Sequence, residues 1–257
     1  MDNARKIKTP KVLAIMINGH QDIDGQCLWT LTNQDYPNLE IIVRCEKPKL
    51  VGKNPVETLY LNCAANRERA RALALKTNAD YFFFVDADII LPAEDIISRL
   101  VKQITQTSPA RMQNPVTGQM MTVKPKHRKK HMIGGWYRTN NPHKWVGGKW
   151  IDNNKFTNYF KPQESVVETD MVGLGCALIS RELLKQVHFR PGIDTHADNV
   201  ATCPCNDCKG KVAEGAMLGE CLDFGNQVSK KGYKMFLDGD IVCGHVKRIN
   251  NERVVLA

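Results

Sequence analysis

Two aspartates, Asp86 and Asp88, follow a strongly apolar stretch in FFFVDADIILP at 82–92. Side chains two residues apart on a strand point to the same side, so both carboxylates can enter one pocket. Carboxylate oxygens suit Mg²⁺ or Mn²⁺, which bridges phosphate oxygens and neutralises the charge that builds up on a departing nucleoside diphosphate. A bare Asp-x-Asp is a common pattern, so the surrounding sequence decides what this pair does.

A second group of possible metal ligands lies in an irregular region at about 190–215 and consists of His196, Cys203, Cys205 and Cys208. Three thiolates and an imidazole suit zinc, which would stabilise a segment too irregular to stabilise itself by burial. The spacing differs from that of a standard zinc finger, and the fourth ligand could equally be Cys221, Cys176 or His188. We predict a structural zinc without a catalytic role; free cysteines are the alternative.

The elements that must position the two aspartates alternate between strand and helix. Apolar runs predict strands at 12–18, 39–44 and 81–85, and helical patterns lie between them at about 24–33 and 62–77. This alternation predicts an α/β fold with a mainly parallel sheet covered by helices. In such folds ligands gather beyond the carboxyl ends of the strands, where both aspartates lie.

The rest of the chain is less regular. A helix with an apolar face follows Pro92, and the stretch 106–163 is rich in Asn, Pro, Gly, Lys and Trp, so we expect loops and short strands there. Strand-like content resumes at 166–179, before a helix that Ser180 can cap. A helix at about 219–231 and two closing strands complete the pattern.

Length and composition allow one sizeable core: 257 residues, 42% hydrophobic, with a formal net charge of +9. We expect one domain over 1–257, divided into a ligand-binding half at 1–105 and a half at 106–257 that carries the cysteine-rich insertion. No apolar stretch reaches the roughly 20 residues of a membrane span, and MDNARKIKTPK lacks a signal core, so a cytoplasmic location is expected. The basic stretch 124–131 either attracts polyanions or solubilises the surface.

Several ordered blocks resemble the GT-A superfamily of nucleotide-sugar glycosyltransferases. They are LTNQDYPNLEIIV at 31–43, the helix, strand and Asp-x-Asp unit at 66–92, VETDMVGLGCALISRELL at 167–184, and GECLDFGNQVSKKGYKMFLDGDIVCGH at 219–245. The resemblance implies a Rossmann-like mixed sheet flanked by helices. It also implies a metal-dependent enzyme that moves a hexose or similar sugar from a nucleotide donor to an acceptor hydroxyl.

Carried over position by position, the resemblance makes Asp88 a direct metal ligand, Asp86 a metal or ribose contact, and His245 the histidine that completes the metal site. It implies a set of donor contacts at Asn18, Glu46, Asn66, Arg67, Arg71, Asp86, Ala87 and Gly173. For the two arginines, solvated positions on an amphipathic helix are the alternative. Relatives place an Asp near Glu46, so recognition of uridine is an expectation from the family.

An inverting transfer needs a carboxylate within hydrogen-bond reach of the acceptor hydroxyl. The resemblance places this base in ECLDF at 220–224, where Cys221 stands at the position of the usual Asp. Glu220 is the first candidate and Asp223 the second, and a retaining mechanism would need neither. Asp170, just before a glycine-containing stretch, could hydrogen-bond hydroxyls of the transferred sugar.

The acceptor is less sharply indicated. The chain looks similar to phage-type glycosyltransferases that modify hydroxymethylated pyrimidines in DNA, which would act in the cytoplasm of a bacterium or a phage-infected host. Such an enzyme needs base flipping or groove access. Trp136 and Tyr137 could form an aromatic wall against a sugar or base, or fill the core. Phosphate contacts would come from Lys126, Arg128, Lys129 and Lys130. A cell-surface glycan, a lipid-linked sugar or a protein is the alternative acceptor.

Two other classes are compatible with parts of the sequence. A nucleotidyltransferase would need a glycine-rich basic loop directly after the first strand, and residues 18–22 do not supply one. A non-catalytic nucleic-acid-binding zinc protein would have no use for the Asp-x-Asp, and Asp88→Ala would then leave its binding unchanged.

Overall fold

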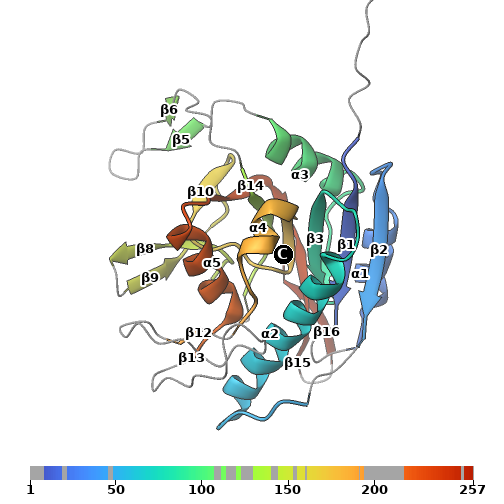
Figure 1. Ribbon diagram of the computed structural model, residues 1–257, viewed down its shortest axis with the longest axis vertical. Coiled ribbons are helices and arrows are strands. Elements are labelled where there is room, and N and C mark those ends of the chain that lie inside the picture. The colour runs from blue at the N-terminus through green and yellow to red at the C-terminus, as the bar shows by residue number, and fades with distance from the viewer. Residues whose placement is uncertain are drawn as a thin grey trace, which may run out of the picture.

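The computed structural model describes residues 9–18, 22–45, 49–106, 111–113, 120–122, 130–139, 144–152, 155–159, 161–190, 192–193, 217–249 and 252–256. The main sheet is built from β1 (Val12–Ile17), β2 (Leu39–Arg44), β3 (Tyr81–Asp86), β7 (Met132–Trp136), β10 (Val167–Thr169), β11 (Cys176–Ser180) and β14 (Met235–Val242). The helices are α1 (Gly25–Thr32), α2 (Pro55–Ala74), α3 (Ile96–Thr105), α4 (Arg181–Gln186) and α5 (Glu220–Lys230). Figure 1 shows the helices packed around this sheet.

Short strands form smaller sheets beside the main one. They are β4 (Ile89–Ile90) with β15 (Gly244–Ile249) and β16 (Glu252–Leu256), β5 (Arg111–Gln113) with β6 (Met120–Thr122), β8 (Gly148–Asp152) with β9 (Lys155–Asn158), and β12 (Gly192–Ile193) with β13 (Met217–Leu218). The sheet of β4, β15 and β16 matters most here, because it joins the chain directly after the two aspartates to the C-terminal segment.

The main sheet has the strand order β10-β14-β7-β11-β3-β1-β2 and is mixed. Strands β2, β1 and β3 run parallel, whereas β11 pairs antiparallel with both β3 and β7. Strands β14 and β7 are parallel again, and β10 is antiparallel to β14. The predicted α/β class with a mixed sheet flanked by helices is confirmed. The expectation of a mainly parallel sheet holds for five of the seven strands, which run in one direction, whereas β11 and β10 run in the opposite direction.

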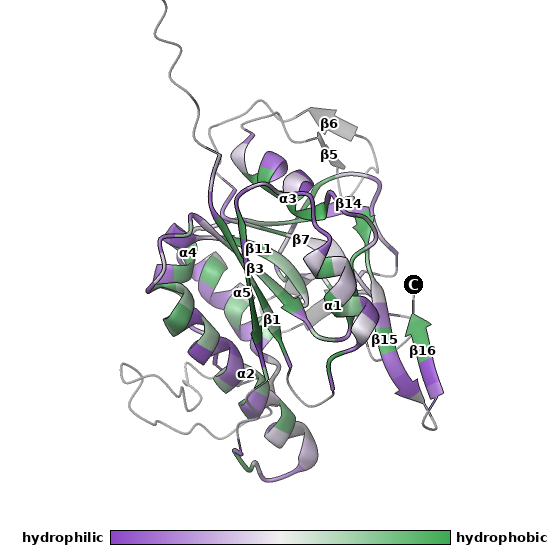
Figure 2. Ribbon diagram, turned by 90° about the vertical axis from the view of Figure 1, so that its right-hand side faces the viewer, coloured by the Kyte–Doolittle hydropathy of each residue, from purple (hydrophilic) through white to green (hydrophobic). Residues whose placement is uncertain are grey.

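The core has two layers, one on each face of the sheet, because alternate side chains of a strand point to opposite faces. On β1, Val12, Ala14 and Met16 pack with α1 and α3, whereas Leu13 and Ile15 pack with α2, α4 and α5. This double burial explains why β1 is apolar without interruption. Figure 2 shows α1 and α3 on one side of the sheet and α2, α4 and α5 on the other.

One helix is longer than predicted, and one of the expected short strands is central to the sheet. Helix α2 begins at Pro55, seven residues before the expected start at 62, because Asn54 caps it by accepting from the backbone N–H of Glu57 at 2.9 Å. Strand β7 lies fully buried inside the sheet, in a stretch expected to form loops and short strands.

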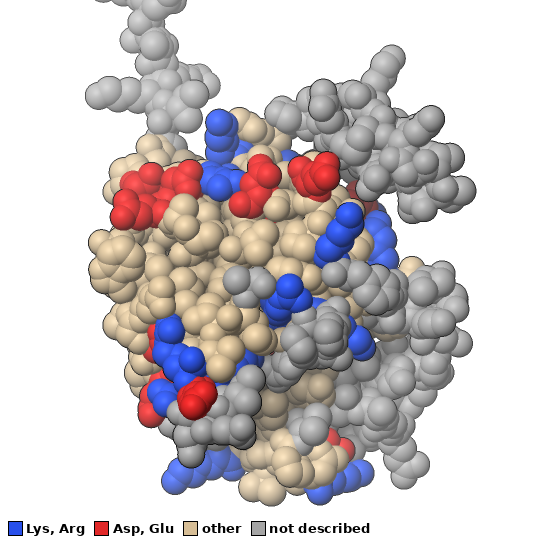
Figure 3. Space-filling model, turned by 180° about the vertical axis from the view of Figure 1, so that it is seen from behind, with Lys and Arg blue, Asp and Glu red and all other residues tan. Residues whose placement is uncertain are grey.

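The described surface is mixed in charge. On the face seen in Figure 3, Lys and Arg lie singly or beside Asp and Glu, and carboxylates gather along the upper edge. In the part of the chain that the structure describes, no helix combines the length and hydropathy of a membrane span.

Candidate active site

The backbone around the two aspartates is fixed by three parts of the chain. The amide of Asp86 donates to the carbonyl of Gly175 at 3.2 Å, and that of Ala87 donates to the carbonyl of Ile17 at 3.1 Å. Strand β4 then pairs with β15, and the amide of Val246 donates to the carbonyl of Asp88 at 2.8 Å. The two carboxylates therefore stand at the carboxyl end of β3, as the alternation of strands and helices predicted.

A cavity of about 160 Å³ opens at this edge of the sheet. It is lined by Ile17, Asn18, Cys63, Arg67, Asp86, Ala87, Asp88, Tyr137, Glu220, His245 and Lys247. Eight of these lining residues were singled out in the sequence analysis: Asn18, Arg67, Asp86, Ala87, Asp88, Tyr137, Glu220 and His245. Segments from both halves of the sequence thus converge on one hollow.

On one side of the cavity, Arg67 links two carboxylates. Its Nη2 lies 2.7 and 2.9 Å from the two oxygens of Asp86, and its Nη1 lies 3.6 Å from Oε1 of Glu220. Arg67 and Glu220 are only 4% and 7% exposed. Burial raises the pKa of Glu220, and the nearby Arg67 offsets only part of this rise. A buried carboxyl with a raised pKa is better matched to accept a proton near neutral pH than an exposed one.

On the other side, Asp88 faces two side chains of β15. Nε2 of His245 and Nζ of Lys247 each lie 3.2 Å from its Oδ2. Burial alone would raise the pKa of Asp88. The contacts with His245 and Lys247 outweigh this effect and lower the pKa to about 2. Asp88 is therefore ionised throughout the physiological range.

The environment of His245 suits a metal ligand. The ring's Nδ1 contacts the backbone carbonyl of Arg138, which can only accept, so Nδ1 carries a proton. Nε2 donates to the carboxylate of Asp88 when the ring is protonated, and it presents a lone pair on the same side when the ring is neutral. A cation between these two acceptors would satisfy both, and imidazole with carboxylate is a donor set that suits Mn²⁺.

Asp86 does not complete this pair in the structure, because both of its oxygens face Arg67. Consistently, no three His, Cys, Asp or Glu side chains within the described ranges form a group ready to hold a metal ion. The residues fit a divalent cation held by Asp88 and His245, with further oxygens supplied by a ligand or by Asp86 after it leaves Arg67.

Within the described part of the chain, two buried polar atoms of cavity-lining residues have no hydrogen-bond partner: Oδ1 of Asn18 and Nε of Arg67. Asn18 is 5% exposed, and its backbone carbonyl accepts from Asn66 at 3.4 Å. Buried polar groups are rarely left without a partner. One acceptor and one donor are thus available to a polar ligand, and Asn66 supports Asn18 instead of lining the cavity.

Tyr137 forms a wall of the cavity. The amide of Gly175 donates to its hydroxyl at 3.0 Å, and its ring meets that of His245 edge to face with centroids 5.6 Å apart. A Cβ at Gly173 would lie 2.3 Å from the same hydroxyl. Gly173, a predicted donor contact, therefore makes room for Tyr137. Of the two predicted wall aromatics, Trp136 is fully buried in the core.

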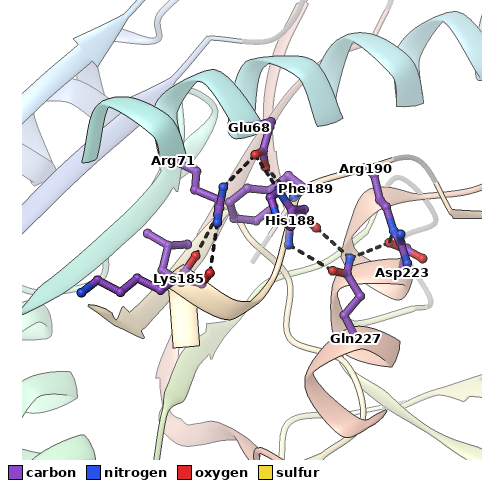
Figure 4. A network of polar contacts seen from close by, with 9 residues as sticks. Glu68, Arg71, Lys185, His188, Phe189, Arg190, Asp223 and Gln227 are labelled. Carbon is purple, nitrogen blue, oxygen red and sulfur yellow. Dashed lines mark hydrogen bonds and ion pairs between the residues drawn. The ribbon is translucent and has the colours of Figure 1, made fainter. Parts of the chain in front are cut away.

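Asp223 is placed away from the cavity, in a polar network between α2, α4 and α5 that Figure 4 shows. Its Oδ2 accepts from Nε of Arg190 at 2.8 Å and from Gln227 at 2.7 Å. It is 6% exposed. This correction removes Asp223 as a candidate base, because its carboxylate is used to hold the chain before residue 191 against α5.

Arg71 belongs to the same network (Figure 4). Its guanidinium donates to the carbonyls of Leu184 and Lys185 and to Glu68, which also meets Nδ1 of His188 at 2.9 Å. Arg71 therefore satisfies carbonyls at the end of α4. The predicted donor contact by Arg71 is not supported, since the residue does not line the cavity.

Asp170 also lies outside the cavity lining. Its Oδ2 accepts from the amide of Trp150 at 3.0 Å, and its own amide donates to the carbonyl of Gly148 at 3.0 Å. The side chain thus fastens the start of β8 to the segment before β11, which corrects the prediction of a sugar contact.

The remaining predicted residues lie mostly outside the described ranges: Glu46, Lys126, Arg128, Lys129, His196, Cys203, Cys205 and Cys208. The zinc site and the contact of Glu46 with the donor's nucleobase therefore stay predictions. Lys130 is described and is 7% exposed: its Nζ donates to the carbonyl of Gln103 at 3.1 Å and lies 5.5 Å from the ring centre of Phe236. Its assignment as a phosphate contact is wrong, because its charge is turned into the protein.

Besides the apolar Ile17, two lining residues with a charge or a thiol were missed by the sequence reasoning. Lys247 stands two residues after His245, so the period of a strand would have placed both on one face. Cys63 lies one turn before Arg67 on α2, where burial raises the pKa of its thiol.

Known proteins give a limited comparison. No family model matches the chain, and no curated protein matches its sequence. Among solved structures, the crystal structure of A197 from STIV is similar with a TM-score of 0.53 and 13% identity, over 96% of this chain and 94% of that chain. This likeness concerns the fold alone.

Two further structures are more distant. The mannosyltransferase PcManGT from Pyrobaculum calidifontis, in complex with GDP-Man and Mn²⁺, has a TM-score of 0.46 and 14% identity, over 92% of this chain and 57% of that chain. GalNAc-T7 with UDP, GalNAc and Mn²⁺ has a TM-score of 0.48 and 12% identity, over 95% of this chain and 44% of that chain. The present chain thus spans about half the length of these two proteins.

Proposed function

We propose that this chain is a GT-A-type glycosyltransferase that uses a divalent cation, Mn²⁺ or Mg²⁺, to transfer a sugar from a nucleotide donor to an acceptor hydroxyl. The observation that carries the proposal is the convergence of Asp88 and His245 at 3.2 Å, beside Asp86 and two cationic side chains, in a cavity at the carboxyl end of β3. Ligands of α/β folds bind at this edge.

The charges of the cavity suit a nucleoside diphosphate. Arg67 and Lys247 supply positive charge, and the unpartnered Oδ1 of Asn18 can accept from a hydroxyl or a base N–H. When bound at Asp88 and His245, the cation would supply Lewis-acid stabilisation of the leaving diphosphate. The protein's own part is to hold the ligand against mostly buried side chains and to limit its contact with water.

We assign the proton acceptor to Glu220. It is the carboxylate of ECLDF that lines the cavity, and burial raises its pKa. Its contact with Arg67 at 3.6 Å is longer than a hydrogen bond, which leaves the carboxylate able to take a proton from an acceptor hydroxyl.

The test is donor turnover. Purified protein is incubated with Mn²⁺ and a panel of UDP- and GDP-sugars, and release of nucleoside diphosphate is measured. Asp88→Ala should lower turnover by about a hundredfold or more, because loss of metal charge stabilisation costs several kcal/mol. Asp240→Ala, which removes a carboxylate that is 75% exposed on β14, should leave turnover unchanged. Equal activity of both variants would refute the proposal.

The finer part of the proposal is the acceptor, for which we put forward a 5-hydroxymethylpyrimidine in DNA. The net charge of +9 supports a polyanionic acceptor. The described face in Figure 3 is mixed in charge and Lys130 is buried, so neither adds to that support. Turnover stimulated by hydroxymethylated DNA, but not by unmodified DNA of the same sequence, is the expected result. Stimulation by a glycan, lipid or protein would replace DNA as the proposed acceptor and would leave the proposed donor reaction unchanged.

A further inference from the structure

The ammonium group of Lys247 lies at the carboxylate of Asp88, where the proposed metal ion would bind. Its Nζ lies 3.2 Å from Oδ2 of Asp88, the same oxygen that Nε2 of His245 meets at 3.2 Å. Lys247 and His245 are two residues apart on β15, so they share one face of the strand. The side chains of Lys247 and Asp88 are only 17% and 15% exposed. The free protein therefore neutralises Asp88 with its own ammonium group.

A divalent cation at Asp88 and His245 would compete with this ammonium group. Two positive charges at one carboxylate oxygen repel each other, and the repulsion is stronger in a partly buried site than in water. Lys247 must therefore leave Asp88 when the metal arrives, and the lost ion pair opposes metal binding.

The described lining of the cavity offers Lys247 no easy replacement. Asp86 is already held by Arg67 through both oxygens, and Glu220 lies beside the same guanidinium. A negatively charged ligand in the cavity would provide the missing partner. A diphosphate is suited to this, since its oxygens can accept from an ammonium group and contact the metal at once.

We propose that Lys247 is an exchangeable counter-ion that moves from Asp88 to the donor's diphosphate, so that metal and diphosphate bind cooperatively. The inference rests on the proposed function and adds a residue and a binding order to it. Metal alone binds weakly because it displaces Lys247 without giving it a partner. Metal with diphosphate binds well because both new charges are matched, and by linkage each ligand strengthens the other equally.

The experiment measures Mn²⁺ binding from the signal of free Mn²⁺ in electron paramagnetic resonance, with and without saturating UDP, and with GDP in a parallel series. Lys247→Met keeps the length of the side chain and removes its charge. It should bind Mn²⁺ alone about three- to tenfold more tightly than the native protein, the size expected for a partly exposed ion pair. In the presence of Mn²⁺ it should bind the nucleoside diphosphate about tenfold more weakly.

Arg248→Met is the matched control, because Arg248 is exposed and alternates to the opposite face of β15. It removes one positive charge from the neighbouring position and should change neither affinity. Lys247→Arg keeps the charge and should stay close to the native protein in both. Lys247→Gln provides a second neutral variant should Lys247→Met fail to fold.

The opposite signs of the two effects make the test decisive. Unchanged or weaker Mn²⁺ binding in both neutral variants would overturn the exchange, as would unchanged binding of nucleoside diphosphate. If the native protein binds neither UDP nor GDP with Mn²⁺, the proposed function itself fails. If it binds one of them and the Lys247 variants behave like the control, only the role of Lys247 fails.

Discussion

Arg67→Met tests whether the ion pairs around Arg67 hold the cavity together. Arg67 and Glu220 are 4% and 7% exposed, so the variant leaves Glu220 as a buried charge without its partner. Removing one member of a buried pair costs about 3–5 kcal/mol. The side chain of Asp86 is 29% exposed, so water can replace part of its contact with Arg67. We therefore take the lower end of this range. The expected loss is about 3 kcal/mol of unfolding free energy at about pH 8.

The pH dependence of this loss follows from Glu220. Burial raises its folded-state pKa above the ordinary 4.5, so the folded chain holds its proton more tightly than the unfolded chain. The contribution of Glu220 to stability is therefore present at low pH and is lost as pH rises through the folded pKa. Without Arg67 that pKa rises further. The cost of Arg67→Met should shrink by about 1 kcal/mol or more at about pH 5.5, because one pKa unit is worth about 1.4 kcal/mol.

Urea denaturation of the native protein, Arg67→Met, Glu220→Gln and the double variant at both pH values measures these terms. Glu220→Gln in the Arg67→Met background should recover more than about 1 kcal/mol at the higher pH, because a neutral amide is cheaper to bury than a charge. A double variant no more stable than Arg67→Met, or a loss independent of pH, would show that Glu220 is not the charge that Arg67 balances.

Three further results are expected. Gly173→Ala should cost about 1–3 kcal/mol of unfolding free energy, because its Cβ would lie 2.3 Å from the hydroxyl of Tyr137. Gly25→Ala is the control and should cost nothing, because its Cβ would meet nothing within 4 Å. Equal denaturation midpoints of the two variants would contradict the crowding at Gly173. Asp223→Ala should lower the unfolding free energy by about 2 kcal/mol and leave donor turnover within about threefold of the native value. Glu220→Gln should lower donor turnover by about a hundredfold. The reverse ranking of turnover would exchange the roles of the two residues. EDTA should abolish donor turnover and added Mn²⁺ should restore it, and turnover that persists in EDTA would exclude a dissociable metal.

Strands β1 and β3 were predictable because they are buried on both faces and appear in the sequence as nearly unbroken apolar runs. Strand β7 has the same burial, but its sequence MIGGW resembles a loop. A Cβ at Gly134 would lie 2.5 Å from the carbonyl of Cys176, and one at Gly135 would lie 2.5 Å from Ile241. Both glycines serve close packing between neighbours that are distant in sequence, and a single sequence does not show those neighbours.

The two aspartates were predicted to share a pocket, and they do, but with different partners. Asp86 is the last residue of β3, whereas Asp88 follows in a turn, so the alternation of a strand does not continue to it. Asp86 consequently meets Arg67 of α2, and Asp88 meets β15. Residue type and spacing predicted that both carboxylates line one cavity, while the partners of Asp88 depend on the pairing of β4 with β15.

Glu220 and Asp223 show the same limit on helix α5. Both lie in its first turn and both are buried, so composition and spacing treat them alike. Arg67 meets the first across the cavity, while Arg190, from the segment after α4, holds the second. The distinction between a site residue and a structural one is made by cations that are distant in sequence.

The pairing of charges in the cavity determines which combination of ligands it favours. Asp86, Asp88 and Glu220 all face cationic side chains, so a ligand meets ion pairs instead of free charges. Binding an anion alone would take a cation from a carboxylate and leave the charge of that carboxylate less well balanced. Binding a metal alone would do the same to a cation. Only a metal and an anion together leave every charge matched, so the arrangement of these side chains favours a metal–diphosphate complex over either component.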